Sequence, residues 1–397
     1  MSEITGWKLK VPLKKTLRSR EEIRAYVIRQ MNEEKDAKER YASTRSAEAF
    51  GLIPKDFDLE NFLVDLLTEQ IAGLYDPKAH EFYIADWIPP EDQEMVMSHE
   101  LTHALEDQRY GIEAWMHAVR SDDDAELSRE SVLEGSAMAA MVEYLLRGKG
   151  LKLKDLPEFD PSLFAGDLAQ TPMIKKAPPF IKDSLMFPYT TGLSFSVRVL
   201  RTDGWNGFDG IFARPPANTQ QILHPEVYRA GKTPAPLKVD LPDGAPGRNW
   251  TLLEENSMGE FGWKEVLKQF LDEKTAQELS VAWDGDRYVT YEDADKKRVL
   301  LFARLRLSNE AAAADFYARY SSLLAKKHPD GTHPLRGAGF FSLDTPAGSS
   351  FLRCSGRECL TGEGADRATF ERWSQKLGWG PLPEVVSAEP AVIKTPR

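Results

Sequence analysis

Residues 97–105 read Met-Ser-His-Glu-Leu-Thr-His-Ala-Leu, so His99 and His103 stand four positions apart with Glu100 next to the first. On an α-helix, residues four apart are separated by about 40° around the axis and about 6 Å along it. Both imidazoles then project from one face and can reach the same ion. Imidazole nitrogen binds zinc at about 2.0–2.1 Å. The spacing therefore predicts a helix that offers two ligands to one metal ion.

Glu100 lies about 100° around the helix from His99, which puts its carboxylate beside a bound ion and not on it. A carboxylate in that place can accept a proton from a water that the metal has made more acidic, the role of a general base. The chain has only 7 His among 397 residues, so this spacing seldom arises by chance. The alternative is an exposed helix face with two solvated histidines, which leaves a third ligand unexplained.

Composition limits the classes of protein that the chain can belong to. Apolar residues make up 42% and charged residues 28%, as in ordinary globular proteins, and the length favours two domains. The net charge of −11 argues against a nucleic-acid backbone or an anionic membrane as partner. No apolar run is long enough to cross a bilayer. We therefore expect no nucleic-acid partner and no membrane span.

Two features leave the cellular location open. The first fifteen residues are basic but lack the apolar core of a secretory signal, which fits a cytoplasmic protein or one exported after a signal is removed. Cys354 and Cys359 enclose four residues and could close a hairpin as a disulfide or remain two thiols.

The region before the motif has clear local signals. Ser19 and Glu22 form a capping-box pattern, and residues 59–72 read as an amphipathic helix. Residues 73–85 read as two short strands around an Asp-Pro turn. Pro89 and Pro90 then end that segment, and we expect the metal-binding helix to begin near Glu91. A strand just before such a helix can be the sheet edge to which an extended peptide adds.

A catalytic zinc ion usually has three protein ligands and one open position. Residues 122–147 have a strong helix pattern, in which Glu126, Glu130 and Glu134 share a face. Such a row is often a solvated surface. Glu134, however, lies among small and apolar residues, where an unpaired carboxylate is costly. A cation is the natural partner for it.

At this point the sequence resembles a known group of enzymes. The His-Glu-x-x-His stretch followed by Leu133-Glu134-Gly135-Ser136-Ala137 resembles the gluzincin-type zinc metallopeptidases. The resemblance implies Zn²⁺ as cofactor and Glu134 as the third ligand with His99 and His103. A competing alignment of Glu130 and Glu134 with the thermolysin-like enzymes would make Glu130 the ligand instead. Asp107, four residues after His103, could support a ligand from outside or simply end the helix.

A wider resemblance covers more of the chain. Residues 69–77, 99–108, 133–137, 187–189 and 219–226 look like those of a bacterial group of predicted zinc metallopeptidases. Gluzincins usually add a tyrosine or histidine that donates to the oxyanion of the transition state. The candidates here are His224 first and Tyr228 second, with Tyr189 as a further choice. His224 could equally tie a loop to the core.

The expected fold class is α+β. We expect a zincin-like metallopeptidase domain over 1–232, largely helical with a small sheet, a linker over 233–249, a smaller α+β domain over 250–380 and a flexible tail over 381–397. The expected function is hydrolysis of peptide bonds through a metal-activated water, with Glu100 as general base and a peptide or protein as substrate. Two alternatives stay open: a catalytically silent zincin-like protein that binds a peptide or partner, and a zinc hydrolase of non-peptide amide or ester bonds.

Overall fold

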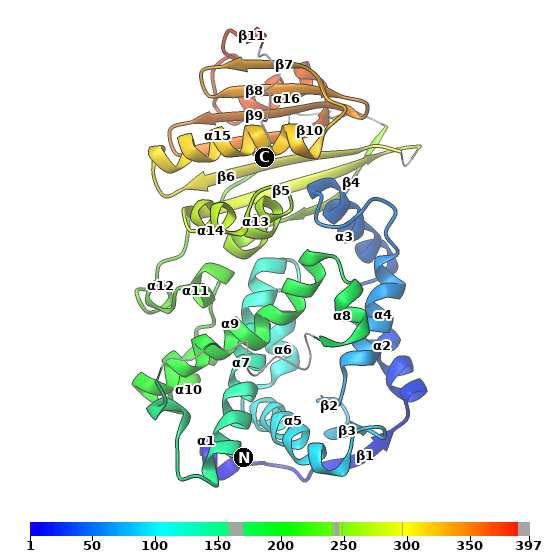
Figure 1. The fold of residues 1–397 in the computed structure, drawn as a ribbon, viewed down its shortest axis with the longest axis vertical. Coiled ribbons are helices and arrows are strands. Elements are labelled where there is room, and N and C mark those ends of the chain that lie inside the picture. Colours follow the sequence, from blue (N-terminus) through cyan, green and yellow to red (C-terminus); the bar gives the residue numbers. More distant parts are fainter. Residues whose placement is uncertain are drawn as a thin grey trace, which may run out of the picture. The chain divides into compact units, whose positions relative to one another are not determined.

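The computed structural model describes residues 1–157, 160, 170–239, 241, 246–247, 249–295 and 297–387. Within these ranges the chain is a mixture of helices and strands, as the α+β expectation required (Figure 1). It forms two compact units. Unit 1 contains Met1–Ala37 and Phe57–Thr233, and unit 2 contains Lys38–Asp56 and Pro234–Arg397. Part of the expected linker and residues 388–397 of the expected tail lie outside the described residues. The described start of that tail is not loose throughout, because Val386 and Ser387 pair with a strand of unit 2.

Unit 1 is mostly helical and carries a small sheet in the order β1-β3-β2, with β1 parallel and β2 antiparallel to β3. Its described elements are α1 (Ser2–Thr5), β1 (Lys14–Arg18), α2 (Arg20–Glu34), α4 (Leu59–Gln70), β2 (Gly73–Asp76), β3 (Glu81–Ala85), α5 (Pro90–Tyr110), α6 (Ile112–His117), α7 (Asp123–Arg147), η1 (Leu153–Asp155), α8 (Pro172–Lys176), α9 (Pro179–Asp203), α10 (Gly207–Ala213), α11 (Thr219–Leu223) and α12 (Pro225–Arg229).

Several local predictions are confirmed in unit 1. Both hydrogen bonds of the capping box between Ser19 and Glu22 are present at the start of α2. Residues 73–85 form the expected hairpin, in which Gly73 pairs with Ile84. The sheet edge differs from the expectation in one respect. The strand directly before α5 is β3, which lies between two neighbours, so the edge strand that contacts α5 is β2.

Unit 2 is built on an antiparallel sheet in the order β11-β7-β8-β9-β10-β6-β5-β4 (Figure 1). Its described elements are α3 (Ala37–Phe50), β4 (Trp250–Asn256), α13 (Gly259–Lys268), α14 (Glu273–Ser280), β5 (Trp283–Asp293), β6 (Val299–Leu307), α15 (Glu310–Lys327), β7 (Thr332–Gly337), β8 (Phe340–Thr345), β9 (Gly348–Ser355), β10 (Glu358–Ala365), α16 (Arg367–Lys376) and β11 (Val386–Ser387).

Strand β10 shows how the sheet is covered on both faces, because successive side chains of a strand point to opposite sides. The sulfur of Cys359 lies 3.9 Å from a carbonyl of α15, and Glu363 pairs with Lys327 of that helix at 2.8 Å. Leu360 belongs instead to the apolar cluster that contains Phe370 and Trp373 of α16. Helices α15 and α16 therefore cover opposite faces of the sheet.

Helix α3 belongs to unit 2, although it comes early in the chain. Arg45 pairs with Glu292 of β5 at 3.0 Å, and Ser46 and Thr290 are hydrogen-bonded at 2.7 Å. The ring of Phe50 packs edge-on against Tyr288, 4.9 Å away between centroids. The expected first domain over 1–232 included this segment. The difference arises because α3 buries its side chains against strands that lie more than 200 residues later, which no local pattern reveals.

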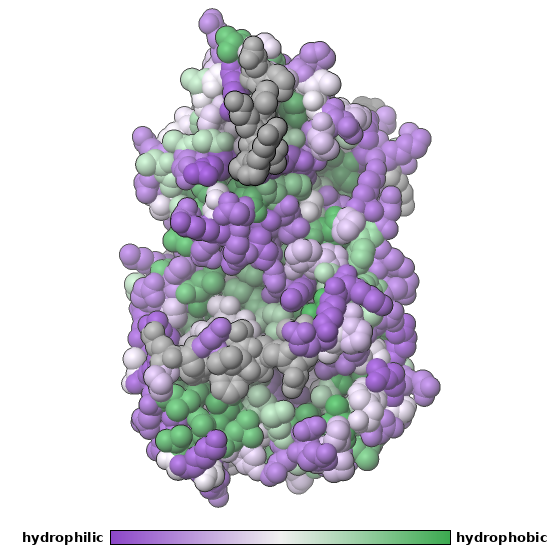
Figure 2. All heavy atoms as spheres, viewed as in Figure 1, coloured by the Kyte–Doolittle hydropathy of each residue, from purple (hydrophilic) through white to green (hydrophobic). Residues whose placement is uncertain are grey.

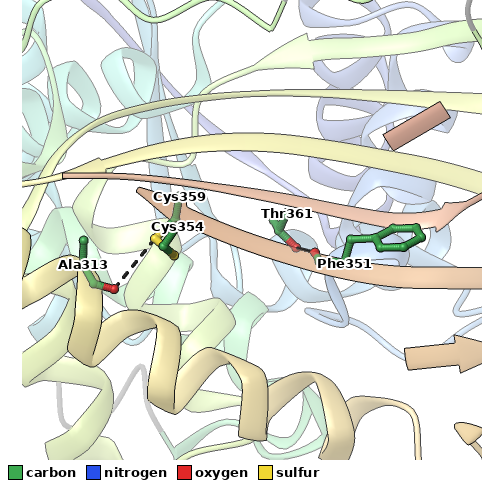
Figure 3. The surroundings of a disulfide bond; sticks show 5 residues. All are labelled: Ala313, Phe351, Cys354, Cys359 and Thr361. Atoms are coloured by element: carbon green, nitrogen blue, oxygen red, sulfur yellow. Dashed lines mark hydrogen bonds between the residues drawn. A yellow bond between two sulfur atoms is a disulfide. The ribbon is translucent and has the colours of Figure 1, made fainter. Parts of the chain in front are cut away.

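The two cysteines form a disulfide across neighbouring strands. Cys354 in β9 and Cys359 in β10 occupy directly opposite positions of the hairpin (Figure 3). Of the two alternatives left open by the sequence, the structure has the disulfide.

Hydrophilic side chains are spread over the face of the molecule seen in Figure 2, with hydrophobic residues between them. Among the described helices, none has the length and apolarity to cross a membrane.

Candidate metal centre

Helix α5 has an apolar face and a face with ionisable side chains. Met97, Leu101 and Ala104 pack against Tyr75 and other apolar side chains of the β2–β3 hairpin. His99, His103 and Glu106 recur at the same helical spacing on a second face. The hairpin therefore fixes the rotation of the helix, and that rotation decides where the polar side chains point.

The second face of α5 meets α7, where three side chains converge. The Nε2 of His99 lies 3.0 Å from the Oε2 of Glu134 and 3.1 Å from the Nε2 of His103. The third separation, between His103 Nε2 and Glu134 Oε2, is 3.6 Å. Within the described ranges, His99, His103 and Glu134 are the one group of three or more acidic, histidine or cysteine side chains that could hold a metal ion. We call these three residues the convergent group.

The three donor atoms have the spacing that a tetrahedral ion requires. Donors at about 2.1 Å from an ion in tetrahedral geometry lie about 3.4 Å from one another, close to the three measured separations. Two imidazole nitrogens that face each other at 3.1 Å also need a proton or a cation between them, because two lone pairs repel. The donor set of two nitrogens and one carboxylate oxygen fits zinc. Three donors leave one tetrahedral position for water or substrate.

Electrostatics in this group favour a cation. The side chains of His99, His103 and Glu134 are only 13%, 12% and 18% exposed. Burial alone would raise the pKa of Glu134, but His103 and His99 outweigh it and hold that pKa well below its usual value. Burial alone would lower the pKa of His103, but Glu134 and Glu106 hold it well above its usual value. Positive charge between the imidazoles and the carboxylate is therefore strongly stabilised.

Glu106 is a supporting residue that the sequence did not single out. Its carboxylate lies 3.2 Å from the Nδ1 of His103, the ring nitrogen turned away from the convergent group, and its side chain is 0% exposed. Ser136 of α7 donates its hydroxyl to the other carboxylate oxygen. A carboxylate on the second ring nitrogen fixes the orientation of a ligating histidine and makes it more basic. The signal available in the sequence was the His-x-x-Glu spacing.

Glu100 lies next to the convergent group. It is buried, and burial raises the pKa of its carboxyl, which His99 and His103 partly offset. It accepts a backbone hydrogen bond from Tyr75 of β2. A Cβ atom at Gly73 would lie 3.3 Å from the Cγ of Glu100, so the edge strand passes directly over this side chain. Glu100 is thus held between the convergent group and the free edge of the hairpin.

Tyr189 of α9 lies beside His99 and Glu134. Its ring is nearly parallel to that of His99, with centroids 6.2 Å apart, and its hydroxyl is hydrogen-bonded to Glu134. Burial, together with Glu134 and Glu130, raises the pKa of Tyr189 well above its usual value. The hydroxyl therefore stays protonated and able to donate at neutral pH.

The two residues ranked ahead of Tyr189 have other partners. Tyr228 donates its hydroxyl to the carbonyl of Arg214 at 2.8 Å and packs against Phe195. His224 precedes α12, and its Nδ1 lies 3.8 Å from Glu226. The described contacts link neither of them to the convergent group, and their predicted role as donors stays a prediction.

Two acidic residues considered in the sequence also lie apart from the three donors. Glu130 is on α7, one turn before Glu134, and is not a member of the group. Asp107 accepts a hydrogen bond from Tyr75 at 2.9 Å, so it ties α5 to β2 and does not contact a ligand histidine.

The close crossing of α7 and α9 sets the position of Glu134 and Tyr189. Gly135 and Gly192 meet where the two helices cross, and a Cβ atom at either one would overlap the backbone of the other helix. Glu134 directly precedes one of these glycines, and Tyr189 lies three residues before the other. Two glycines at one contact let the backbones approach closely enough for these two side chains to meet.

Comparison with known proteins adds one match. The family model of DUF8575, a domain of unknown function, matches residues 251–372, which lie within unit 2 and make up less than half of the chain. No curated protein and no solved structure matches the chain.

Proposed function

We propose that this protein is a zinc-dependent metallohydrolase that cleaves peptide bonds, with a zincin-like arrangement in unit 1. The observation that carries the proposal is the convergence of His99, His103 and Glu134 at the spacing of a tetrahedral ion, with Glu100 beside them. Zinc, when bound there, supplies a water of lowered pKa and a Lewis acid for the carbonyl.

The side chains of the chain itself have distinct roles in this proposal. Glu100 accepts a proton at its carboxylate and passes it to the leaving amine. Tyr189 is close enough to Glu134 to donate to the oxyanion that develops in the transition state. The outer edge of β2, where the N–H of Tyr75 is already bonded to Glu100, offers its remaining backbone groups to an extended peptide, which would lie beside Glu100. That edge strand is what favours a peptide over a small ester as substrate.

The experiment combines metal analysis with cleavage of a peptide library. The purified protein should contain about one zinc ion per chain, and Glu134→Gln should lose it. Glu130→Gln should keep it, which separates the two alignments of the acidic residues. Glu100→Gln should also keep zinc, while its kcat falls by about 10²–10⁴-fold.

The outcomes distinguish a peptidase from a binding protein and from a non-peptide hydrolase. If wild type and Glu100→Gln both hold zinc and neither cleaves any peptide, the enzyme proposal fails and a binding role gains. Activity on esters or simple amides with peptides untouched would point to a non-peptide hydrolase.

A further inference from the structure

A cavity of about 490 Å³ opens in unit 1 among α2, α4, β2, α6 and the first turns of α7. This volume is within the range of ligand-binding pockets. Much of its wall is apolar and comes from Val27, Met31, Leu67, Leu74, Ile112 and Met116. The His99, His103 and Glu134 side chains do not line it, so the cavity is separate from the metal centre.

Two elements run from the metal centre to this cavity. In β2, Gly73 lies against Glu100, and the following residues 74–78 line the cavity. In α7, Glu134 is in the metal centre, and Glu126, eight residues earlier, lines the cavity. Eight residues of α-helix span about 12 Å. A peptide lying along β2 would therefore pass from the reacting bond into the cavity.

The carboxylates of this region are not fully paired. Lys78 is shared by Glu33 at 2.6 Å and Glu113 at 3.5 Å. Within the described part of the chain, Glu34 and Glu126, which also line the cavity, form no hydrogen bond and no salt bridge.

Arg120 also lines the cavity, and Arg120 and Lys35 partly offset the charge of Glu34 and Glu126. The lining still has five acidic side chains against two basic ones, Lys78 and Arg120.

Glu130 extends this unpaired charge towards the metal centre. It lies on α7 between Glu126 and Glu134 and likewise has no hydrogen bond or salt bridge among the described residues. Burial raises the pKa of Glu126 to about 7 and that of Glu130 to about 8, and neighbouring carboxylates add to both shifts. Near neutral pH the two carboxyls are therefore partly protonated, and a bound cation would favour their ionised form. Glu130 is nevertheless exposed to solvent. Glu130 does not itself line the cavity, but it lies one helical turn from Glu126, which does.

We propose that this cavity is a subsite for a cationic group of the substrate: a lysine or arginine side chain, or the free amino terminus of a peptide. The inference rests on the proposed peptidase function. The apolar wall suits the methylene stem of a long basic side chain, and the unpaired carboxylates receive its charge. A second metal ion does not fit, because in the described residues no other three ligand groups converge.

The distance along α7 gives the position of the cationic group in the substrate. An extended peptide advances about 3.3 Å per residue, so about 12 Å corresponds to three or four residues. We therefore place the cationic group three or four residues from the bond that is cleaved.

The test measures binding, so that it does not depend on turnover. Zinc-loaded Glu100→Gln protein is titrated with fluorescein-labelled peptides that differ only at one scanned position, which holds lysine, norleucine or glutamate. At one position the lysine peptide should bind about 10–100-fold more tightly than the norleucine peptide. Acetylated and free amino termini are compared, so that a side-chain cation is distinguished from an α-ammonium group.

Variants then assign the preference to the cavity. In the same Glu100→Gln background, Glu126→Gln should reduce the ratio of lysine to norleucine binding, and Glu126→Lys should reverse it in favour of glutamate. The matched control is Glu21→Gln, an equal change of charge at an exposed position of α2. It should leave the ratio as it was. Thermal melting of each variant checks that the fold is kept.

The proposal is overturned if lysine has no advantage at any position, if no peptide binds, or if the advantage survives in both Glu126 variants with the fold intact. These results are separate from the fate of the proposed function. Preferential lysine binding by a protein that cleaves nothing would leave the subsite and remove the enzyme. Cleavage of peptides without any preference for lysine would support the enzyme proposal and rule out the subsite.

Discussion

Glu106 holds His103 through the Nδ1 nitrogen and is itself held by Ser136, so one buried carboxylate joins α5 to α7 behind the metal centre. Its neighbour Asp107 has the same charge but contacts Tyr75 of the edge strand. The two acids therefore form a natural pair for testing which one supports the metal ligands.

We predict that Glu106→Gln lowers zinc affinity by about 10–100-fold, because the imidazole of His103 loses its charged partner. Asp107→Asn should leave zinc affinity nearly unchanged. Competition with a chromophoric chelator measures both. Equal losses in the two variants would show that general disturbance of α5, and not the contact with His103, is responsible.

The oxyanion donor gives a second prediction at this scale. Tyr189→Phe removes a hydroxyl that lies beside Glu134, and kcat should fall by about 10²–10³-fold with zinc content unchanged. Tyr228→Phe should change kcat little, because its hydroxyl is bonded to a backbone carbonyl. A large loss for Tyr228→Phe and a small one for Tyr189→Phe would restore the order expected from the sequence.

At the scale of elements, the crossing of α7 and α9 is the contact most sensitive to added volume. Gly135→Ala would push a methyl group into the backbone of α9, which should cost at least about 1–3 kcal/mol of stability. Gly148→Ala is the control, since that glycine follows the same helix, has a φ of −62° and has open space around it. Urea unfolding of both variants measures the difference. Similar midpoints for the two would argue against a tight crossing.

Helix α13 gives a prediction for pH. Asp286 is only 7% exposed and accepts hydrogen bonds from the backbone of Met258 and Gly259 at the start of that helix. Burial raises its pKa to about 6, above the value of about 3.9 expected for an unfolded chain. The folded state therefore holds the proton more tightly. This contribution to stability is complete below pH 4 and is lost as the pH rises through 6.

Asp286→Asn should keep a neutral side chain at every pH and serve as the reference. Relative to this variant, wild type should lose about 2 kcal/mol of stability between pH 4 and pH 7, by the linkage of proton binding to folding. Urea unfolding of both proteins across this range tests it, since other titrating groups cancel in the difference. A difference that does not vary with pH would contradict the shifted pKa.

The element scale also shows what the sequence could predict. The helices α4, α5 and α7 and the β2–β3 hairpin have strong periodicity and clear end signals, and they form near the expected positions. His99, His103 and Glu134 meet because their identity and helical spacing restrict the geometry. Glu106 was missed because its role depends on the rotation of α5, which is set by packing on the hairpin.

At the scale of the whole molecule, the chain crosses between its two units near Ala37, Asp56 and Thr233. Unit 2 is therefore incomplete without α3. The ring of Phe50 lies edge-on between Tyr288 and Trp263, with centroids 4.9 and 6.2 Å away. Losing a buried phenylalanine side chain typically costs about 3–5 kcal/mol.

We predict that residues 234–397 alone melt at a markedly lower temperature than unit 2 of the full chain. A synthetic peptide of residues 37–56 should bind this fragment and raise its melting temperature. The same peptide with Phe50→Ala should raise it much less. If the fragment melts at the same temperature with and without the native peptide, α3 is dispensable for unit 2.

The early position of α3 also has a consequence for synthesis on the ribosome. The helix emerges long before the strands β5 and β6 against which unit 2 is built, so it must wait while the rest of unit 1 is translated. During that interval the apolar face of α3 has no native cover, and a chaperone or a non-native neighbour can occupy it. Unit 2 can close only after nearly all of the chain has been made, which makes slow translation or truncation of the carboxyl-terminal half a direct route to misfolded protein.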